Sequence, residues 1–445
     1  MTSQRSSPLR VLLIVDSLYW TIGHFAHQVK KDNPDIEAMI CSQHVIRQFL
    51  KRYGKFPLSF DVVHFLNTKT MDAFLGHLPA VITLHHMDSS THVKYLEDCD
   101  AVMTVSGQWM KYLSDIGIPL NKIGMVPFAV DHHQFFPASR DERSQIRRTL
   151  KIPEEAFVVG FSGRQTSNND GRKGIDIFVE GVRKVYQEYS QLVTVIIGPG
   201  WHELVRQFHD AGITCVQVPY QVEHADIARL YRALDVYWVT SRIEGGPVPL
   251  LEAMASGISC ISTPVGAALD LLKDKKNGFL VPFDSSESFA KITLQLVHNP
   301  DIKSGIGEAA RATIIQERQW SQTKSNLLGL YELAIHNFNV CQTQDSSSKH
   351  NNLDVEESCS LSGPGHQGFD KDFNPKQSDW MMSCEYVRGT QMLIQLGEWR
   401  RVIQFVGLAV KADPQNLSIW PQVLAMIFRA WKKKLFPRRV VKTRT

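Results

Sequence analysis

Short apolar runs that alternate with helical segments set the fold class of this chain. Strands that are covered by helices on both faces of a parallel sheet have continuous apolar sequences, and most of these runs are rich in valine and isoleucine. The first set lies at 11–15, 37–41, 61–66, 80–85 and 101–106, and the second lies near residues 160, 197, 217, 237, 261 and 280. We therefore predict an α/β protein with two Rossmann-like, doubly wound parallel-sheet domains.

Length and composition agree with a globular protein of several domains. The chain has 445 residues, of which 43% are apolar, so it can bury two or three cores. Its net charge of +4 is modest and partly concentrated at the C-terminus, which argues against a nucleic-acid partner. The seven cysteines are scattered without paired spacing, as in proteins of a reducing cytoplasm. We predict a cytoplasmic protein without a signal peptide or transmembrane segment, because the first apolar run is too short for either.

The C-terminal part of the chain differs in composition from the rest. Residues 339–376 lose the apolar period and fill with Ser, Asn, Asp and Gly, so we expect a flexible linker there. Residues 377–445 are expected to form a helical appendage with a basic tail, in which 397–416 weakly resemble one tetratricopeptide-type helix pair. One such unit buries no continuous core, so a small helical hairpin is the alternative.

Two glutamates, Glu244 and Glu252, stand eight residues apart around the start of an apolar helix. Pro247 suits the first turn of that helix, and Gly257 can end it in a left-handed conformation. The unpaired N–H groups of the first turn, next to the flexible Gly245-Gly246 pair, form an anion site that fits a diphosphate. Carboxylates beside it would accept hydrogen bonds from sugar hydroxyls. Taken alone, an ordinary surface helix with a capping acid explains the glutamate pair better.

The flanking motifs change that balance. Residues 8–338, about three quarters of the chain, resemble a GT-B glycosyltransferase of glycosyltransferase family 4, whose members are retaining enzymes with nucleotide-sugar donors. The motifs that carry the resemblance are GFSGRQTSNNDGRKG (160–174), SRIEGGPVPLLEAMASG (241–257), TPVGA (263–267) with NGFLVPF (277–283), and PFAVDHHQFFP (127–137). The resemblance implies an acceptor-side domain at 1–138 and a donor-binding domain at 139–338, which face each other across a cleft. The last helix of the second domain would return toward the first.

The resemblance assigns the donor diphosphate to Arg164 and Lys173, since a guanidinium and an ammonium can share the charge of the leaving group. Two ordinary surface cations are the alternative. Arg172 stands beside Lys173, which leaves open which of the two faces the phosphate. By the same resemblance, Glu252 accepts hydrogen bonds from the ribose hydroxyls and Glu244 faces the transferred sugar.

Backbone groups complete the implied donor site. Those around Gly246, Pro247 and Val248 would bind sugar hydroxyls or phosphate oxygens. Gly198 resembles the glycine turn beneath the nucleotide, although a lone G-x-G also fits a purely structural turn. Backbone contacts to the base would come from 216–220.

The acceptor side of the resemblance is less regular. His85 ends an apolar run and matches the histidine that faces the donor sugar, whereas an isolated histidine at a strand end is otherwise structural. His86 stands where the family often has an aspartate, and Gly23 stands alone where a glycine pair is common. The acceptor side is therefore expected to be atypical.

No metal site is expected. Asp98 and Asp100 have D-x-D spacing, but the sequence around them is that of a helix end that enters a buried strand. His132 and His133 lack further partners at ligand spacing. Because cations and a helix N-terminus already supply positive potential for the diphosphate, we predict a metal-independent enzyme without a cofactor, which uses the nucleotide sugar as a substrate.

These features predict a retaining glycosyltransferase that moves a hexose-type sugar to a glycan, lipid-linked or small-molecule acceptor. One alternative is another GT-B enzyme, such as an epimerase or phosphorylase. The other is a non-catalytic nucleotide-sugar-binding scaffold that acts on a protein partner through its C-terminal helices.

Two basic segments, 44–56 and 426–445, suggest contact with an anionic membrane and a peripheral location on its cytoplasmic face. A core-facing helix with a solvated basic side is the alternative for 44–56. A solvated, frayed terminus is the alternative for 426–445.

Overall fold

A computed structural model of the chain describes most of the residues before 351. The described residues are 7–16, 21–31, 33–47, 60–66, 78–87, 93–165, 170–218 and 224–350. By its internal contacts the chain divides into two compact units, Met1–Ala80 with Phe338–Thr445 and Val81–Asn337.

The first sheet is parallel and has the strand order β2-β1-β3-β4-β5-β6. Its strands are β1 Leu9–Val15, β2 Ile36–Ser42, β3 Val62–Phe65, β4 Ala80–Leu84, β5 Ala101–Thr104 and β6 Ile123–Met125. The helices along this stretch are α1 Thr21–Lys30, α3 Val93–Asp98, α4 Gly107–Asp115 and the 3-10 turn η2 Leu120–Lys122. Every residue of β3, β4 and β5 is buried, as helices on both faces of a sheet require.

The second sheet is also parallel, with the order β12-β11-β10-β7-β8-β9. Its strands are β7 Phe157–Ser162, β8 Leu192–Ile197, β9 Thr214–Val218, β10 Val236–Val239, β11 Ser259–Ser262 and β12 Phe279–Leu280. Its helices are α5 Arg140–Thr149, α6 Asp170–Lys173, α7 Ile175–Glu188, α8 His202–Asp210, α9 His224–Tyr231, α10 Val248–Ala255, α11 Ala267–Leu271, α12 Ser286–His298, α13 Pro300–Glu317 and α14 Trp320–His350.

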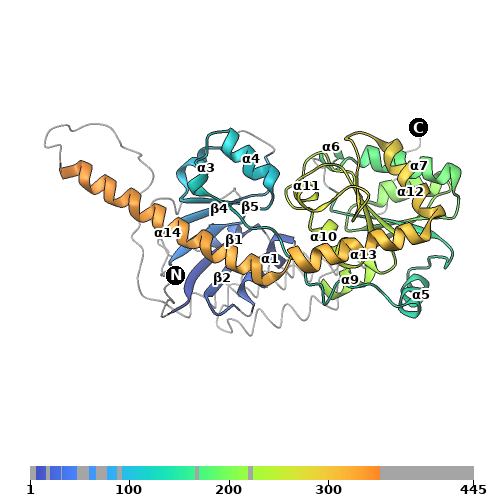
Figure 1. Ribbon diagram of the computed structural model, residues 1–445, viewed down its shortest axis with the longest axis horizontal. Coiled ribbons are helices and arrows are strands. Elements are labelled where there is room, and N and C mark those ends of the chain that lie inside the picture. Colours follow the sequence, from blue (N-terminus) through green and yellow to red (C-terminus); the bar gives the residue numbers. More distant parts are fainter. Residues whose placement is uncertain are drawn as a thin grey trace, which may run out of the picture. The chain divides into compact units, whose positions relative to one another are not determined.

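The predicted fold class is confirmed: two parallel, Rossmann-like sheets form, and each predicted run contains a strand. Aromatic side chains fill the core of the second sheet, where Phe178 of α7 packs edge-on against Trp238 of β10 with ring centroids 5.7 Å apart. Helix α12 packs against α7 (Figure 1). The short strand β6, with one buried residue, was not predicted. The domain boundaries at 138 and 338 stay a prediction.

Helix α14 extends further than the sequence suggests. It continues to His350, so the first residues of the expected linker 339–376 are helical. Buried residues such as Leu330 and Tyr331 anchor the helix, and extension of an established helix costs little. Asn337 of this helix donates to the carbonyl oxygens of Asp100 and Asn121, at 2.9 and 3.2 Å. The rest of the linker and the appendage at 377–445 lie outside the described residues.

Little of the two proposed membrane segments falls within the described residues. Val45 and Ile46 are buried, as a core-facing helix requires, whereas residues 48–56 and 426–445 are not described. In the part of the chain that the structure describes, no helix combines the length and the apolar character needed to cross a membrane.

A buried ion cluster ties α5 and α13 to the second sheet. Asp235, directly before β10, is 8% exposed and binds Arg143, Arg147 and Lys303 at 2.8, 2.7 and 2.6 Å. Its carboxylate also accepts the backbone N–H of Val158 at 2.9 Å. Burial alone would raise the pKa of Asp235, but the three cations together hold the pKa below its usual value.

We predict that Asp235→Asn destabilises the fold by about 3–5 kcal/mol, because it leaves buried cations without their counter-charge. Since the folded-state pKa of Asp235 is lowered, its contribution is complete above the unfolded-state pKa and is lost as pH falls through the folded-state pKa. The melting temperature of the variant should therefore vary less between about pH 5 and pH 2 than that of the wild type. Equal loss of stability in Asp115→Asn, which removes the exposed Lys111–Asp115 pair, would contradict this account.

Candidate functional site

The segment 241–257 folds as the sequence predicts. Helix α10 begins at Val248 with Pro247 as its N-cap residue, and Gly257 follows it with φ of 72°. Glu244 lies in the loop before the helix, whereas Glu252 lies inside it. In the first turn of α10, Pro249 has no N–H and the N–H of Leu250 donates to the Pro247 carbonyl oxygen at 2.8 Å, so few free donors remain there beside Glu244.

Lys173 and Glu244, which the sequence analysis assigned to one donor site, form an ion pair. Lys173 Nζ lies 2.5 Å from Glu244 Oε1, and Arg172 Nη1 lies 3.2 Å from the same oxygen. Ser241 Oγ donates to it as well, at 3.1 Å. Both neighbouring cations thus face Glu244, so the structure does not separate their roles.

Burial and charge act in opposite directions on Glu244. The Glu244 side chain is 11% exposed, and this burial alone would raise its pKa. The charges of Lys173 and Arg172, the hydrogen bond from Lys173 and the charge of His86 outweigh burial and lower the pKa. Glu244 is therefore held as a carboxylate that can accept hydrogen bonds.

The Glu252 carboxylate accepts a hydrogen bond from a tyrosine that the sequence analysis did not select. Glu252 is 5% exposed, and Tyr231 Oη of α9 donates to its Oε2 at 2.7 Å. Burial and the neighbouring carboxylate raise the pKa of Tyr231, so the phenol stays a donor. A tyrosine at the end of an amphipathic helix resembles a core residue, so no local signal identified Tyr231.

Two glycine-containing loops meet beside Arg164. Gly163, at the end of β7, and Gly198, at the end of β8, approach so closely that a Cβ on Gly198 would lie 2.1 Å from the Gly163 carbonyl oxygen. Gly198 has φ of 129°, a conformation that favours glycine, so this residue is needed for the shape of the turn. Arg164 lies in the first of the two loops, and its side chain is exposed.

The end of β4 lies against the Glu244 loop. A Cβ on Gly245 would lie 1.9 Å from the carbonyl oxygen of His85, so only glycine fits there. The His85 ring stacks on Phe128, with centroids 5.7 Å apart. Trp109 of α4, which sequence reasoning missed, donates from Nε1 to the Glu244 carbonyl oxygen at 2.8 Å. The structure thus brings His85 to the loop that carries Glu244.

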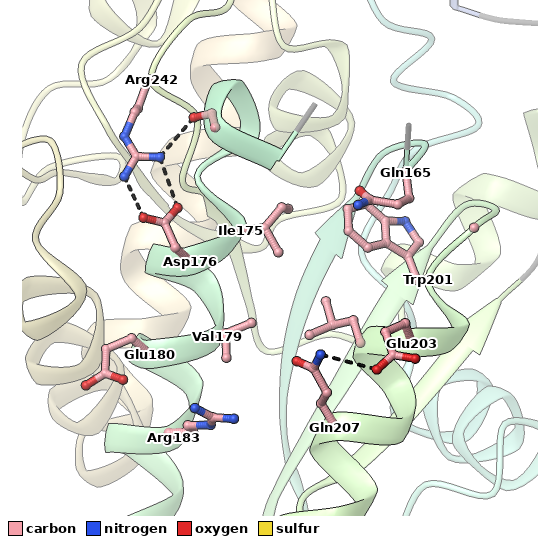
Figure 2. Close-up of a pocket in the computed structure, with 13 residues that line it drawn as sticks. Gln165, Ile175, Asp176, Val179, Glu180, Arg183, Trp201, Glu203, Gln207 and Arg242 are labelled. Atoms are coloured by element: carbon pink, nitrogen blue, oxygen red, sulfur yellow. Dashed lines mark hydrogen bonds and ion pairs between the residues drawn. The ribbon is translucent and has the colours of Figure 1, made fainter. Parts of the chain in front are cut away.

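A separate pocket of about 620 Å³ lies between α7 and α8 (Figure 2). Ile175, Val179, Trp201 and Leu204 supply its apolar walls, and the Arg242–Asp176 ion pair lies at one end. Gly200 of the G-x-G turn at 198–200 lines it, whereas Arg164, Lys173, Glu244 and Glu252 do not.

Asp98 ends α3 and Asp100 precedes the buried strand β5, as the rejection of a D-x-D metal site assumed. Among the described residues, no group of three or more His, Cys, Asp or Glu side chains is placed to hold a metal ion. Independence from metals and cofactors stays a prediction.

A family model matches the part of the chain that carries most of these groups. Residues 142–313 match the model of the family described as "Glycosyl transferases group 1". The matched part contains the second sheet and the loops that carry Arg164, Lys173, Glu244 and Glu252.

Two relatives match at low identity. D-inositol 3-phosphate glycosyltransferase of Stackebrandtia nassauensis is 26% identical over 57% of this chain and 58% of its own length. Phosphatidyl-myo-inositol mannosyltransferase of Mycobacterium leprae is 26% identical over 43% of this chain and 50% of its own length. The chain thus spans only 50–58% of the length of these relatives.

Solved structures share the fold. HepE of Anabaena, in complex with UDP and glucose, matches 72% of this chain and 98% of its own with a TM-score of 0.60 at 16% identity. Sucrose-phosphate synthase of Thermosynechococcus elongatus matches 76% of this chain and 100% of its own with a TM-score of 0.53 at 15% identity. Residues 142–313 thus match the glycosyl transferases group 1 family model, and the chain, with its two parallel Rossmann-like sheets, has the GT-B fold.

Proposed function

We propose that this chain is a retaining, metal-independent glycosyltransferase that moves a hexose-type sugar from a nucleotide-diphosphate sugar to an acceptor hydroxyl. The observation that carries the proposal is the meeting of Lys173 and Arg172 on the Glu244 carboxylate beside the N-terminus of α10. Two cations face one carboxylate there, so the cluster keeps positive charge for an anionic leaving group.

Each part of the site has a task in this reaction. Lys173 and the exposed Arg164 would bind the diphosphate and stabilise the negative charge that develops as the bond to the anomeric carbon breaks. Ionised Glu244 would accept hydrogen bonds from hydroxyls of the transferred sugar, and His85 would face that sugar. The backbone around Gly246, Pro247 and Val248 would bind its oxygens or those of the phosphates.

Glu252 would bind the ribose of the donor. Tyr231 donates to Oε2 of Glu252 at 2.7 Å and so helps to hold the buried carboxylate in one orientation. A Glu252 carboxylate that is already oriented would lose little conformational entropy when it binds the two ribose hydroxyls. The role of Gly198 would be indirect, since it shapes the loop that carries Arg164.

The names of similar proteins support the substrate classes. HepE is described in complex with UDP-glucose, and a relative from Corynebacterium glutamicum is named as dependent on GDP-mannose. Other relatives are named for inositol 3-phosphate or phosphatidylinositol acceptors. We propose a UDP- or GDP-hexose donor and a glycan, lipid-linked or small-molecule acceptor. A cytoplasmic location, membrane contact through 44–56 and 426–445, and a protein partner of the C-terminal helices stay predictions.

Sugar transfer tests the proposal. With purified full-length chain, radiolabelled UDP- and GDP-hexoses and an acceptor panel of inositol phosphates, phosphatidylinositol and oligosaccharides, we expect transfer by the wild type with retained anomeric configuration. Glu244→Gln, Arg164→Ala and Lys173→Ala should each lower kcat/KM by about 100-fold or more. The control Glu203→Gln removes an exposed glutamate that pairs with Arg206 and should leave the rate unchanged. Near-normal transfer rates in the three site variants would contradict the assignment of these residues to the donor site.

The pH dependence of transfer tests the electrostatics. Because the pKa of Glu244 is lowered, the carboxylate stays ionised, and the rate that depends on it is retained, until pH falls below the usual glutamate range. Arg172→Ala removes one of the lowering charges while burial still raises the pKa, so the acid limb of kcat/KM should move to higher pH. An unchanged acid limb in this variant would show that Glu244 is not the titrating group.

A further inference from the structure

Arg242 makes an unusually complete set of hydrogen bonds for a half-exposed arginine. Its Nη1 and Nη2 bind the two carboxylate oxygens of Asp176 at 2.9 and 2.7 Å (Figure 2). Its Nε binds Asp284 at 2.7 Å. Nη1 also donates to the carbonyl oxygen of Gly171 at 2.9 Å. Only a planar guanidinium fork can make these contacts at once.

The contact with Gly171 is the first of three on successive residues. The backbone N–H of Arg242 donates to the carbonyl oxygen of Arg172 at 2.8 Å, and Thr240 Oγ1 donates to that of Lys173 at 2.9 Å. The last carbonyls of a helix have no partner within the helix, and α6 ends at Lys173. The strand-end residues 240–242 thus satisfy the carbonyl groups of 171–173 one after another.

The next residue locks the same junction. Gly174 has φ of 62°, and a Cβ on it would lie 2.0 Å from the carbonyl oxygen of Thr240. The backbone of 171–174 therefore has one position relative to the 240–242 loop. Lys173 and Glu244 project from these two joined segments, and their side chains meet at 2.5 Å.

We expect the Arg242 side chain to contribute little to the free energy of unfolding, because it is partly exposed and its carboxylate partners are exposed. Its partners Asp176 and Asp284 are 64% and 63% exposed, and Arg242 itself is 31% exposed. Exposed ion pairs usually add little to the free energy of unfolding, and a bidentate pair such as Arg242–Asp176 adds more than most. A displacement of about 1 Å at a binding group, in contrast, can cost much of its effect.

We propose that Arg242 is a positioning residue for the donor diphosphate: it clasps 171–173 to the 240–242 loop and so sets the place of the Lys173 ammonium beside Glu244. The inference rests on the proposed function, since it acts through the binding of diphosphate by Lys173. Arg242 itself does not touch the donor.

A double-mutant cycle on the full-length chain tests the clasp. Isothermal titration with UDP and with inorganic pyrophosphate compares the wild type, Arg242→Ala, Lys173→Ala and the double variant. We expect Arg242→Ala to raise Kd about tenfold in the wild-type background and less than about twofold when Lys173 is already alanine. Arg242→Lys should bind both probes as weakly as Arg242→Ala does, because an ammonium cannot make the bidentate contacts of the guanidinium. Arg206→Ala, which removes another exposed arginine that pairs with Glu203, should bind as the wild type does.

Each other outcome has a distinct meaning. A Kd within twofold of the wild type in Arg242→Ala overturns the positioning role, and equal losses in both backgrounds show that Arg242 does not act through Lys173. If Arg242→Ala fails to fold, the same cycle with Asp176→Asn, which keeps the shape of the partner, decides the question. If the wild-type chain binds neither UDP nor pyrophosphate, the proposed donor site itself is wrong. If the wild type binds them and Arg242→Ala binds them equally well, only the positioning role of Arg242 is wrong.

Discussion

The Glu244 carboxylate, shared by Lys173 and Arg172, is the interaction on which the site depends. In a buried position its negative charge would be costly alone, and the two cations would repel each other without it. Together they form a compact charged cluster that retains net positive character at the start of α10. The elements around it are arranged so that this cluster can form and stay in place.

Three parts of the chain meet at that cluster. Trp109 holds the carbonyl of Glu244, Gly245 lets the end of β4 approach, and Thr240 with Arg242 binds the carbonyls that precede Gly174. These contacts join segments far apart in the sequence through backbone groups. Such backbone contacts leave the side chains of Lys173 and Glu244 to interact with each other.

Much of the fold follows from local sequence, and the site follows only in part. The apolar runs predicted the strands because full burial on both faces leaves a continuous pattern, and Pro247 and Gly257 marked the ends of α10. The predicted start of the linker at residue 339 is too early, because α14 continues to His350. A polar composition does not end a helix whose preceding residues are anchored by burial. Glu244 and Lys173 were found through motifs. Tyr231, Trp109 and Arg242 were not, since their partners lie too far along the chain for any local pattern to show.

The central claim is that the groups around Glu244 form a nucleotide-diphosphate-sugar site. Thermal unfolding of the full-length chain with a panel of UDP-, GDP-, ADP- and dTDP-sugars tests it most directly, because a ligand at 100 times its Kd stabilises the folded state by about 2.7 kcal/mol. We predict that at least one donor raises the melting temperature of the wild type and leaves that of Lys173→Ala nearly unchanged. No shift with any donor, or the same shift in both proteins, would contradict the account.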